Sequence, residues 1–353
     1  MNAYDVKRMA VHLESVGFEE VEDYASADII IFNTCYIRGK AADKVWSELG
    51  RIYDEFGHSR IIALVGCMAK AEGAKIFKRA PYVGIVLSSR QYHKLPELLR
   101  RAQAGESRLI DTELEGLKKF DSLPALKSAS SAEFIQVQEG CDQYCTYCCV
   151  PYTRGREVSR PPADVLQEAR GLAQGGATEI CLVGQNVNAY AGEGGLSGLI
   201  HEIAKLPQVE KIRYTTAYPS RYSDELIALH ASEPKLAKLL YLPAQSGSDK
   251  ILKNMNRKYT RDSYLALVDK IRAVNPELKI SSDFIVGFPG ETDDDFEQTL
   301  SLIQMVGFVN SYSFKFSPRP GTPAATMEGQ IPEKIKTARI RELQKLLKNH
   351  LPL

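Results

Sequence analysis

The sequence predicts an α/β protein in which two series of parallel strands and helices follow one another. Short runs rich in β-branched residues alternate with helical stretches over residues 1–104, and six such runs recur over residues 132–330. Residues 105–131 between them lack an apolar strand or helix pattern and are expected to form a linker. Parallel strands need a crossover connection, usually a helix, so this alternation favours parallel sheets.

The first domain, residues 1–104, is predicted to open on a helix. Its apolar residues recur at helical spacing, at Val6, Met9 and Leu13. Three apolar runs then follow with helical stretches between them, at residues 27–35, 60–69 and 83–89. A βαβ unit needs a strand before its helix, so the chain is expected to start one strand late.

Two cysteines stand at the ends of these runs. Cys35 closes the first apolar run and Cys67 lies near the C-terminal end of the second. The carboxyl ends of parallel strands share one edge of a sheet, where ligands bind. The two thiols are therefore expected to converge.

The second domain, residues 132–330, is predicted to be a partial or complete β/α barrel. Its six strand candidates occupy residues 132–140, 179–186, 212–219, 239–247, 278–290 and 309–321. In such a fold the working residues lie on the loops that follow the strands. Residues 331–353 are expected to form a basic amphipathic helix that packs with one solvated face.

Composition excludes several classes of protein. A net charge of +1 over 353 residues gives no global footprint for nucleic acid, so any RNA contact must come from local clusters. No apolar run approaches the roughly 20 residues that span a bilayer, and the N-terminus is not a signal peptide. The protein is therefore expected to be cytoplasmic and to have no membrane partner. In the reducing cytoplasm, clustered thiols are expected to bind metal rather than form disulfides.

Four of the seven cysteines lie within residues 141–149. Cys141, Cys145 and Cys148 have the spacing C-x3-C-x2-C, and the alternative ending on Cys149 has the spacing C-x3-C-x3-C. A zinc site normally has four ligands in two knuckles, and no second knuckle is present. Three thiolates suit an iron–sulfur cluster that leaves one iron open.

The first spacing, with Tyr147 before the last cysteine, resembles the signature of radical S-adenosylmethionine (SAM) enzymes. The resemblance makes Cys141, Cys145 and Cys148 the catalytic ligands of a 4Fe–4S cluster. Its open iron would chelate SAM, and one electron would cleave SAM to a 5′-deoxyadenosyl radical. Cys149 is then expected to be a small buried hydrophobic residue.

Further stretches narrow the resemblance to one family. They are NTCYIRGKAADKV, VGCMA, EGCDQYCTYCCVPYTRGREVSR, LVGQNVNAY, LPAQSGSDKIL, SSDFIVGFPGET and FSPRPGTPAA. Together they resemble the bacterial methylthiotransferases, in particular the MiaB family, over essentially the whole chain. Cys149 stands where that family usually has valine.

The resemblance implies transfer of a methylthio group to C2 of N6-isopentenyladenosine 37 in tRNA. Two SAM molecules would take part, one for methylation of sulfur and one for the radical. The alternatives are a methylthiotransferase for threonylcarbamoyl-adenosine tRNA or a ribosomal protein, and a truncated fragment that binds SAM and a cluster without inserting sulfur. The implied partners are the tRNA and an electron donor such as flavodoxin or ferredoxin, with the protein acting as a monomer.

The family holds a second, auxiliary 4Fe–4S cluster through three cysteines of its N-terminal domain. Cys35 and Cys67 match two of them. The family's third cysteine ends a first strand that would precede Met1, and its RNA-binding TRAM barrel would follow Leu353. The sequence is therefore expected to be truncated at both ends.

Residues at the ends of the barrel strands are the candidates for SAM contact. They are Gln185, Asn186, Gln245, Ser246, Asp283 and Gly287, and Arg257 is a candidate partner for the SAM carboxylate. Each has a plainer alternative, such as loop structure for the amides or a surface salt bridge for Arg257. Arg154 and Arg156 could contact RNA phosphate or brace the cysteine loop. The nearby tyrosines could stack on adenine or pack around the cluster, at Tyr144, Tyr147 and Tyr152.

Overall fold

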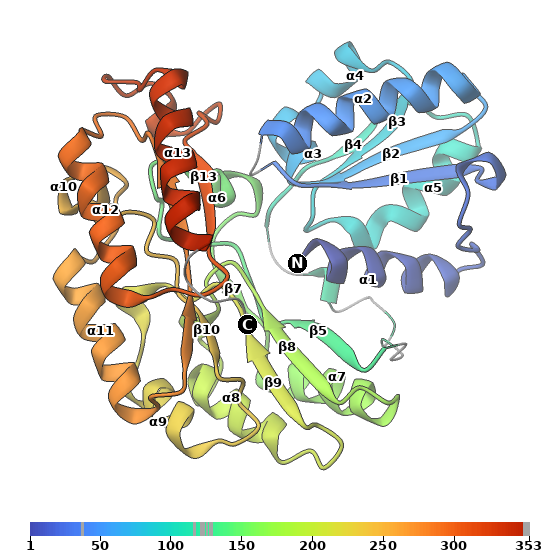
Figure 1. Ribbon diagram of the computed structural model, residues 1–353. Helices are drawn as coiled ribbons and strands as arrows, with labels where there is room; N and C mark the ends of the chain where they lie inside the picture. The colour runs from blue at the N-terminus through green and yellow to red at the C-terminus, as the bar shows by residue number, and fades with distance from the viewer. Residues whose placement is uncertain (37–38, 116–117, 121–123, 125, 127–129, 349–353) are drawn as a thin grey trace. The chain divides into compact units, whose positions relative to one another are not determined.

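The computed structural model describes residues 1–36, 39–115, 118–120, 124, 126 and 130–348. The chain forms two compact units (Figure 1). The N-terminal unit contains Met1–Leu126, Glu139–Cys141 and Cys149–Val158, and the C-terminal unit contains the remaining residues. The cysteine loop thus contributes Cys141 to the first unit and Cys145 and Cys148 to the second.

A parallel four-stranded sheet forms the centre of the N-terminal unit. Its strands pair in chain order, as β1 (Ile29–Thr34), β2 (Ile61–Gly66), β3 (Val83–Leu87) and β4 (Leu109–Asp111). The register pairs Thr34 with Gly66 and Leu87 with Asp111. All four carboxyl ends therefore lie at one edge of the sheet.

Helices cover both faces of this sheet (Figure 1). One face carries α2 (Gly39–Phe56), α3 (Cys67–Glu72) and α4 (Lys75–Arg79), and the other carries α1 (Asn2–Glu14) and α5 (Leu95–Gln103). The shorter helical segments of this unit are α6 (Val150–Thr153), η1 (Tyr24–Ser26), η2 (Tyr92–Lys94) and η3 (Lys118–Phe120).

The central strand β2 shows why its sequence is apolar at successive positions. Ile62 and Leu64 pack into the core under α2, whereas Ala63 and Val65 pack into the core under α1 and α5. Successive side chains of a strand point to opposite faces, so a strand covered on both sides must be apolar at every position. This pattern confirms the parallel α/β prediction for the first domain.

Of two further predictions for the N-terminal part of the chain, the structure confirms one and contradicts the other. The opening helix is confirmed as α1, with Met9 buried and Val6 exposed. The expectation that residues 105–131 contain no strand is wrong, because β4 pairs with β3 as the fourth strand of the sheet. The strand has only three residues, of which only Leu109 is buried, so it has no readable periodicity.

Parallel strands also form the C-terminal unit. The pairings are β5 (Ala132–Gln136), β8 (Glu179–Val183) and β9 (Lys211–Tyr214) in one sheet, β10 (Leu239–Tyr241) with β11 (Lys279–Ser281), and β12 (Asp283–Val286) with β13 (Tyr312–Lys315). Two short strands, β6 (Gln138–Glu139) and β7 (Val158–Ser159), also pair. Every predicted strand run thus contains a strand, and within the described residues the pairings form several parallel sheets rather than one continuous closed sheet.

Helices follow the strands of this unit in alternation. They are α7 (Pro162–Gln174), α8 (Gly195–Ala204), α9 (Asp224–Ser232), α10 (Asp249–Asn254), α11 (Arg261–Val274), α12 (Asp293–Val306) and α13 (Glu333–Lys348), with the short segments η4 (Val187–Ala189), η5 (Pro219–Arg221) and η6 (Pro323–Ala325). Capping boxes at Thr260 and Thr292 begin α11 and α12 by satisfying free backbone N–H groups.

The predicted basic helix is confirmed as α13, and two of its cations are buried. Lys336 and Arg339 are 7% and 6% exposed. Arg339 donates to the Glu291 carboxylate at 2.8 Å. In the part of the chain that the structure describes, no helix has the length and apolar character needed to cross a membrane.

Candidate active site

The cysteine loop is closed at its base by backbone contacts within the N-terminal unit. Cys141 N–H donates to the Gly155 carbonyl at 3.2 Å. Gly140 has φ +84°, and a Cβ atom added there would lie 2.1 Å from the Arg156 carbonyl oxygen. Only glycine permits this approach, so the chain returns directly beside the first cysteine.

The turn between the second and third cysteines is held by α10 within the C-terminal unit. Cys148 N–H donates to the Cys145 carbonyl at 2.9 Å. Between them, Thr146 donates from its backbone N–H to Met255 and from its hydroxyl to Asn254, at 3.1 and 2.8 Å. The turn is therefore fixed by the end of a helix that lies more than a hundred residues away in sequence.

Arg257 contacts the sulfur of Cys145. Its Nη1 donates to Cys145 Sγ at 3.3 Å, its Nε to the Tyr259 hydroxyl at 2.8 Å and its Nη2 to the Pro243 carbonyl at 3.2 Å. Burial alone would lower the pKa of Arg257, but Tyr259, Tyr147 and Cys145 raise that pKa well above its usual value. The guanidinium stays charged, and within the described part of the chain it pairs with no carboxylate, so the surface salt bridge is not observed there.

The three tyrosines of the loop differ in exposure. Tyr147 packs edge-on against Phe288, with ring centroids 6.4 Å apart, and burial raises the pKa of its hydroxyl well above the usual value. Tyr144 and Tyr152 are 43% and 47% exposed. Packing is therefore the observed role of Tyr147, while the other two present their rings to solvent.

Gln185 and Asn186 follow β8 as predicted. Their backbone N–H groups both donate to Gln138 Oε1, at 3.0 and 3.1 Å. Gln138 is fully buried on the neighbouring β6. Sequence reasoning missed this residue because a glutamine in an apolar run has no recognisable signal.

Gln245 and Asp283 are brought together after β10. Gln245 N–H donates to the Asp283 carbonyl at 2.8 Å, and its carbonyl accepts from Ile285 N–H at 2.9 Å. Gln245 has φ +68°, a conformation that non-glycine residues rarely adopt and that occurs preferentially at functional sites. Ser246 turns inward, where its hydroxyl accepts from Ser248 N–H at 3.2 Å.

Gly287 follows β12 with φ +70°, which matches its predicted place in a loop. In the structure, the space beside its Cα is filled by Lys336 of α13, whose Cγ would lie 2.4 Å from an added Cβ. The Gly287 N–H donates to Glu291 Oε2 at 2.6 Å.

Cys35 and Cys67 lie at adjacent strand ends, as predicted. Cys35 follows Thr34, the last residue of β1, and Cys67 follows Gly66, the last residue of β2, and these two strand residues are register partners. Cys67 is 4% exposed and its sulfur accepts from Arg154 Nε at 3.3 Å. The thiols thus occupy equivalent positions at one edge of the sheet.

Arg154 belongs to a buried network of charges. Its Nη1 pairs with Glu139 at 2.9 Å and its Nη2 with Asp5 at 3.0 Å, while Lys119 pairs with Glu139 at 2.6 Å. Burial raises the pKa of Glu139, but Lys119 and Arg154 outweigh this and lower the pKa to about 2. Arg154 therefore braces the loop and does not reach solvent, so the phosphate alternative for this residue is wrong.

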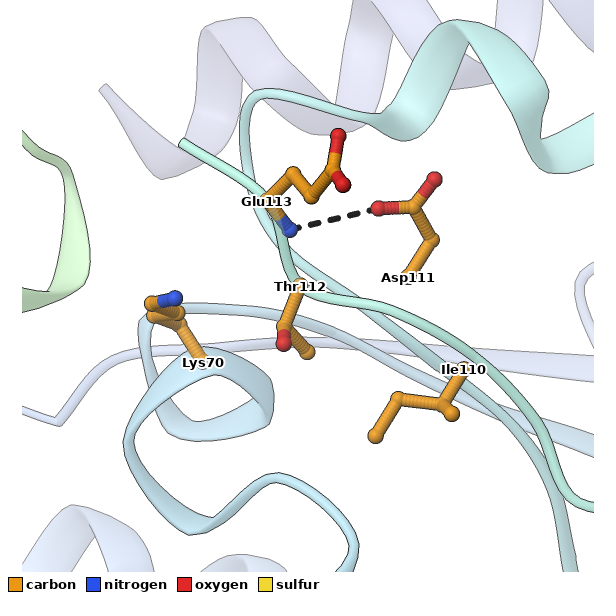
Figure 2. Close-up of a pocket in the computed structure, with 5 residues that line it drawn as sticks. All are labelled: Lys70, Ile110, Asp111, Thr112 and Glu113. Carbon is orange, nitrogen blue, oxygen red and sulfur yellow. Dashed lines mark hydrogen bonds between the residues drawn. The ribbon is translucent and has the colours of Figure 1, made fainter. Parts of the chain in front are cut away.

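A pocket opens beside β4 at the same edge of the sheet (Figure 2). Its lining residues are Lys70, Ile110, Asp111, Thr112 and Glu113. Glu113 N–H donates to Asp111 Oδ1 at 3.2 Å. The lining carries one cation, two carboxylates and no thiol, and none of these residues was predicted from the sequence.

The remaining two cysteines, Cys149 and Cys181, are buried and are not proposed as cluster ligands. Cys149 lies in the core with Leu49 and Ile62 and is 4% exposed, which confirms its expected apolar environment. Cys181 lies in β8, and burial raises the pKa of its thiol to about 11. The Cys181 thiol therefore stays protonated, and both cysteines are packed inside the protein.

The donor set of the loop fits an iron–sulfur cluster. Among the described residues, no three His, Cys, Asp or Glu side chains converge on a single metal-ion position. A 4Fe–4S cluster binds each thiolate to a different iron, so its ligands need not meet at one point. The sulfur of Cys145 also already faces a fixed cation, as a ligating thiolate would.

Comparisons with known proteins agree with this chemistry. The radical SAM superfamily model matches residues 135–303, which defines the class of the C-terminal unit, and the model of Uncharacterized protein family UPF0004 matches residues 1–88. A structure of the radical SAM methyltransferase TsrM from Kitasatospora setae, with cobalamin and a 4Fe–4S cluster bound, has a TM-score of 0.67 at 15% identity, over 91% of this chain and 74% of that chain. This likeness shows the fold.

The curated relatives identify the family more narrowly than the family models or the structural likeness do. The chain is 50% identical to the tRNA-2-methylthio-N(6)-dimethylallyladenosine synthase of Zymomonas mobilis, over 98% of this chain and 79% of that protein. It is 48% identical to the enzyme of the same name from Novosphingobium aromaticivorans, over 98% of this chain and 80% of that protein. The chain belongs to the family of tRNA-2-methylthio-N(6)-dimethylallyladenosine synthases, whose radical SAM chemistry uses a 4Fe–4S cluster and SAM.

Proposed function

We propose that this chain adds a methylthio group to C2 of N6-isopentenyladenosine at position 37 of tRNA. The observation that carries the proposal is the identity of about half the residues to enzymes of that name over 98% of the chain. A shared cysteine loop alone would indicate only radical SAM chemistry. Similarity that extends through both units supports the same substrate.

Cys141, Cys145 and Cys148 are the proposed ligands of the SAM-cleaving cluster. That cluster, when bound, supplies the electron that breaks a carbon–sulfur bond of SAM. The chain itself orients the ligands: the Thr146 turn is tied to α10, and Arg257 directs a positive charge at Cys145. Tyr147 and Phe288 keep one side of the turn apolar and so help to exclude water.

The proposed SAM contacts remain those at the strand ends, namely Gln185, Asn186, Gln245, Ser246, Arg257, Asp283 and Gly287. Their support is position, because working residues of β/α folds gather after the strands. The backbone of Gln245 is bonded on both sides, so the direction of its Cα–Cβ bond is fixed. Gly287 would act through its backbone, since Lys336 occupies the space beside it.

Cys35 and Cys67 are the proposed ligands of an auxiliary 4Fe–4S cluster that serves sulfur insertion. Their support is the shared strand register and the cationic partner of Cys67. We further propose a cytoplasmic monomer that takes electrons from a flavodoxin or a ferredoxin.

Anaerobic reconstitution of the purified chain tests this function. The protein is incubated with SAM, a reductant and tRNA that carries isopentenyladenosine, and the digest is analysed by mass spectrometry. Formation of both 5′-deoxyadenosine and 2-methylthio-isopentenyladenosine is expected, and both should disappear in Cys145→Ala. About eight irons per chain are expected, the sum of two four-iron clusters.

The same experiment separates the alternatives. Product in threonylcarbamoyl-adenosine tRNA or a ribosomal protein, with none in isopentenyladenosine, would overturn the substrate. About four irons per chain, with 5′-deoxyadenosine but no methylthio product, would reduce the chain to a SAM-cleaving fragment.

A further inference from the structure

The side chain of Arg257 is held by several contacts with the chain itself, although a side chain that binds a small ligand would need free N–H groups. Each of its three nitrogens already donates a hydrogen bond to the chain, to Cys145, Tyr259 and Pro243. The guanidinium carbon also lies 4.3 Å from the ring centroid of Tyr218 and 4.9 Å from that of Tyr259. These contacts fix both the plane and the direction of the guanidinium.

The group that Arg257 reaches is a sulfur atom. Cys145 is 7% exposed, so the contact lies in a region with little water, where a charge acts strongly. The N-terminal unit repeats the arrangement, with Arg154 Nε donating to Cys67 Sγ at the same distance of 3.3 Å. Each proposed cluster site therefore contains one arginine directed at one cysteine, half-buried at Arg257 and buried at Arg154.

We infer that Arg257 is a positioning residue that acts through Cys145 and raises the reduction potential of the SAM-cleaving cluster. The inference rests on the proposed role of Cys145 as a cluster ligand. Reduction adds one electron to the cluster and its thiolates. A cationic N–H donor at a ligand sulfur stabilises that added charge, so the cluster accepts the electron more readily.

Redox titration of the reconstituted chain in the absence of SAM tests the inference. The fraction of reduced cluster is followed by electron paramagnetic resonance in wild type, Arg257→Lys and Arg257→Gln. The midpoint potential is expected to fall in both variants, and further in Arg257→Gln, which loses the charge as well as the donor geometry. Omitting SAM matters, because a residue that served only the SAM carboxylate would leave this potential unchanged.

A matched pair of tyrosine variants keeps the test independent of folding. Tyr259→Phe removes the hydroxyl that accepts from Arg257 Nε and donates to the Ala244 carbonyl, and a smaller fall in potential is expected. Tyr264→Phe removes a buried hydroxyl that donates to Leu242 at 2.8 Å, with no bond to Arg257, and no change is expected. If Arg257→Gln fails to fold, the lysine and phenylalanine variants decide.

The outcomes are distinguishable. An unchanged potential in Arg257→Lys and Tyr259→Phe, with an intact cluster, overturns the inference and leaves the proposed function standing. Weakened binding of SAM to those variants at unchanged potential would assign Arg257 to the SAM carboxylate instead. A wild-type chain that binds no cluster would overturn the inference together with the proposed function.

Discussion

At the scale of single residues, the adjacent Cys148 and Cys149 have opposite environments. Cys149 is buried in the apolar core of the N-terminal unit, and its Sγ lies 3.9 Å from the Tyr36 carbonyl oxygen. Cys148 is half-buried at the end of the Thr146 turn. The Cys149 thiol therefore serves packing, which favours Cys148 as the proposed ligand.

Replacement of each cysteine by valine tests this assignment. Cys149→Val should keep the full iron content and change the free energy of unfolding by about 1 kcal/mol, since it replaces one small buried apolar group by another. Cys148→Val should lose about four irons, the content of one cluster. Iron counting and urea unfolding measure the two effects, and the reverse pattern would make Cys149 the ligand.

The proposed ligand cysteines Cys141, Cys145 and Cys148 can be recognised in the sequence because their spacing lies within a few residues of one loop. The residues that contact the candidate site residues could not be predicted from the sequence. Arg257 lies 112 residues from Cys145, and Gln138 lies 47 residues from Gln185. Such contacts depend on which loops the fold brings together, and an arginine or glutamine looks the same in sequence whether it faces a sulfur or solvent.

At the scale of elements, a buried charge network joins four segments of the N-terminal unit. Asp5 comes from α1, Lys119 from η3, Glu139 from β6 and Arg154 from the end of α6. All four residues are at most 3% exposed. Breaking one member leaves uncompensated buried charge, which typically costs about 3–5 kcal/mol.

Glu139→Gln is expected to destabilise the chain by about that amount at pH 7. The pKa of Glu139 is about 2 in the folded chain and 4.5 ordinarily, so its ionised form stabilises the fold above pH 4.5. This contribution is lost as the pH falls from 4.5 towards 2. The difference in unfolding free energy between wild type and variant should therefore shrink over that range.

Urea unfolding at a series of pH values measures this difference. The control is Glu106→Gln, because Glu106 is an exposed carboxylate that pairs with Arg101 at 2.8 Å. Exposed pairs contribute little, so this variant should unfold like wild type. A Glu139→Gln variant as stable as wild type at pH 7 would contradict the role of the network.

The buried Lys119 of this network also shows why the sequence of residues 105–131 predicts only a linker. A buried lysine at position 119 is read from sequence as a solvent-exposed charge, and β4 is too short to show alternation. The longer strands were predictable because covered parallel strands are apolar along their whole length. A charged residue that is buried because it forms ion pairs, such as Lys119, gives no such pattern in the sequence.

At the scale of the whole molecule, the two units contain different sets of thiols. Cys35, Cys67 and Cys141 belong to the N-terminal unit, and Cys145 and Cys148 to the C-terminal unit. Each unit has its own apolar core, so a thiol can be removed from one without repacking the other. Removal of Cys67 and removal of Cys145 should therefore have separable effects on the insertion of sulfur and the cleavage of SAM.

Cys67→Ala should still form 5′-deoxyadenosine, because the proposed SAM-cleaving ligands are untouched, but it should yield no methylthio product. Cys145→Ala should yield neither. Cys181→Ala is the matched control, since it also removes a buried thiol, at the same 4% exposure, that lies outside both proposed sites. It should form both products, as measured by mass spectrometry of the nucleosides after a single anaerobic incubation. Methylthio-adenosine from Cys67→Ala at the level of the control would show that sulfur insertion does not depend on the thiol of Cys67, and Arg154 would then hold that cysteine for structural reasons alone.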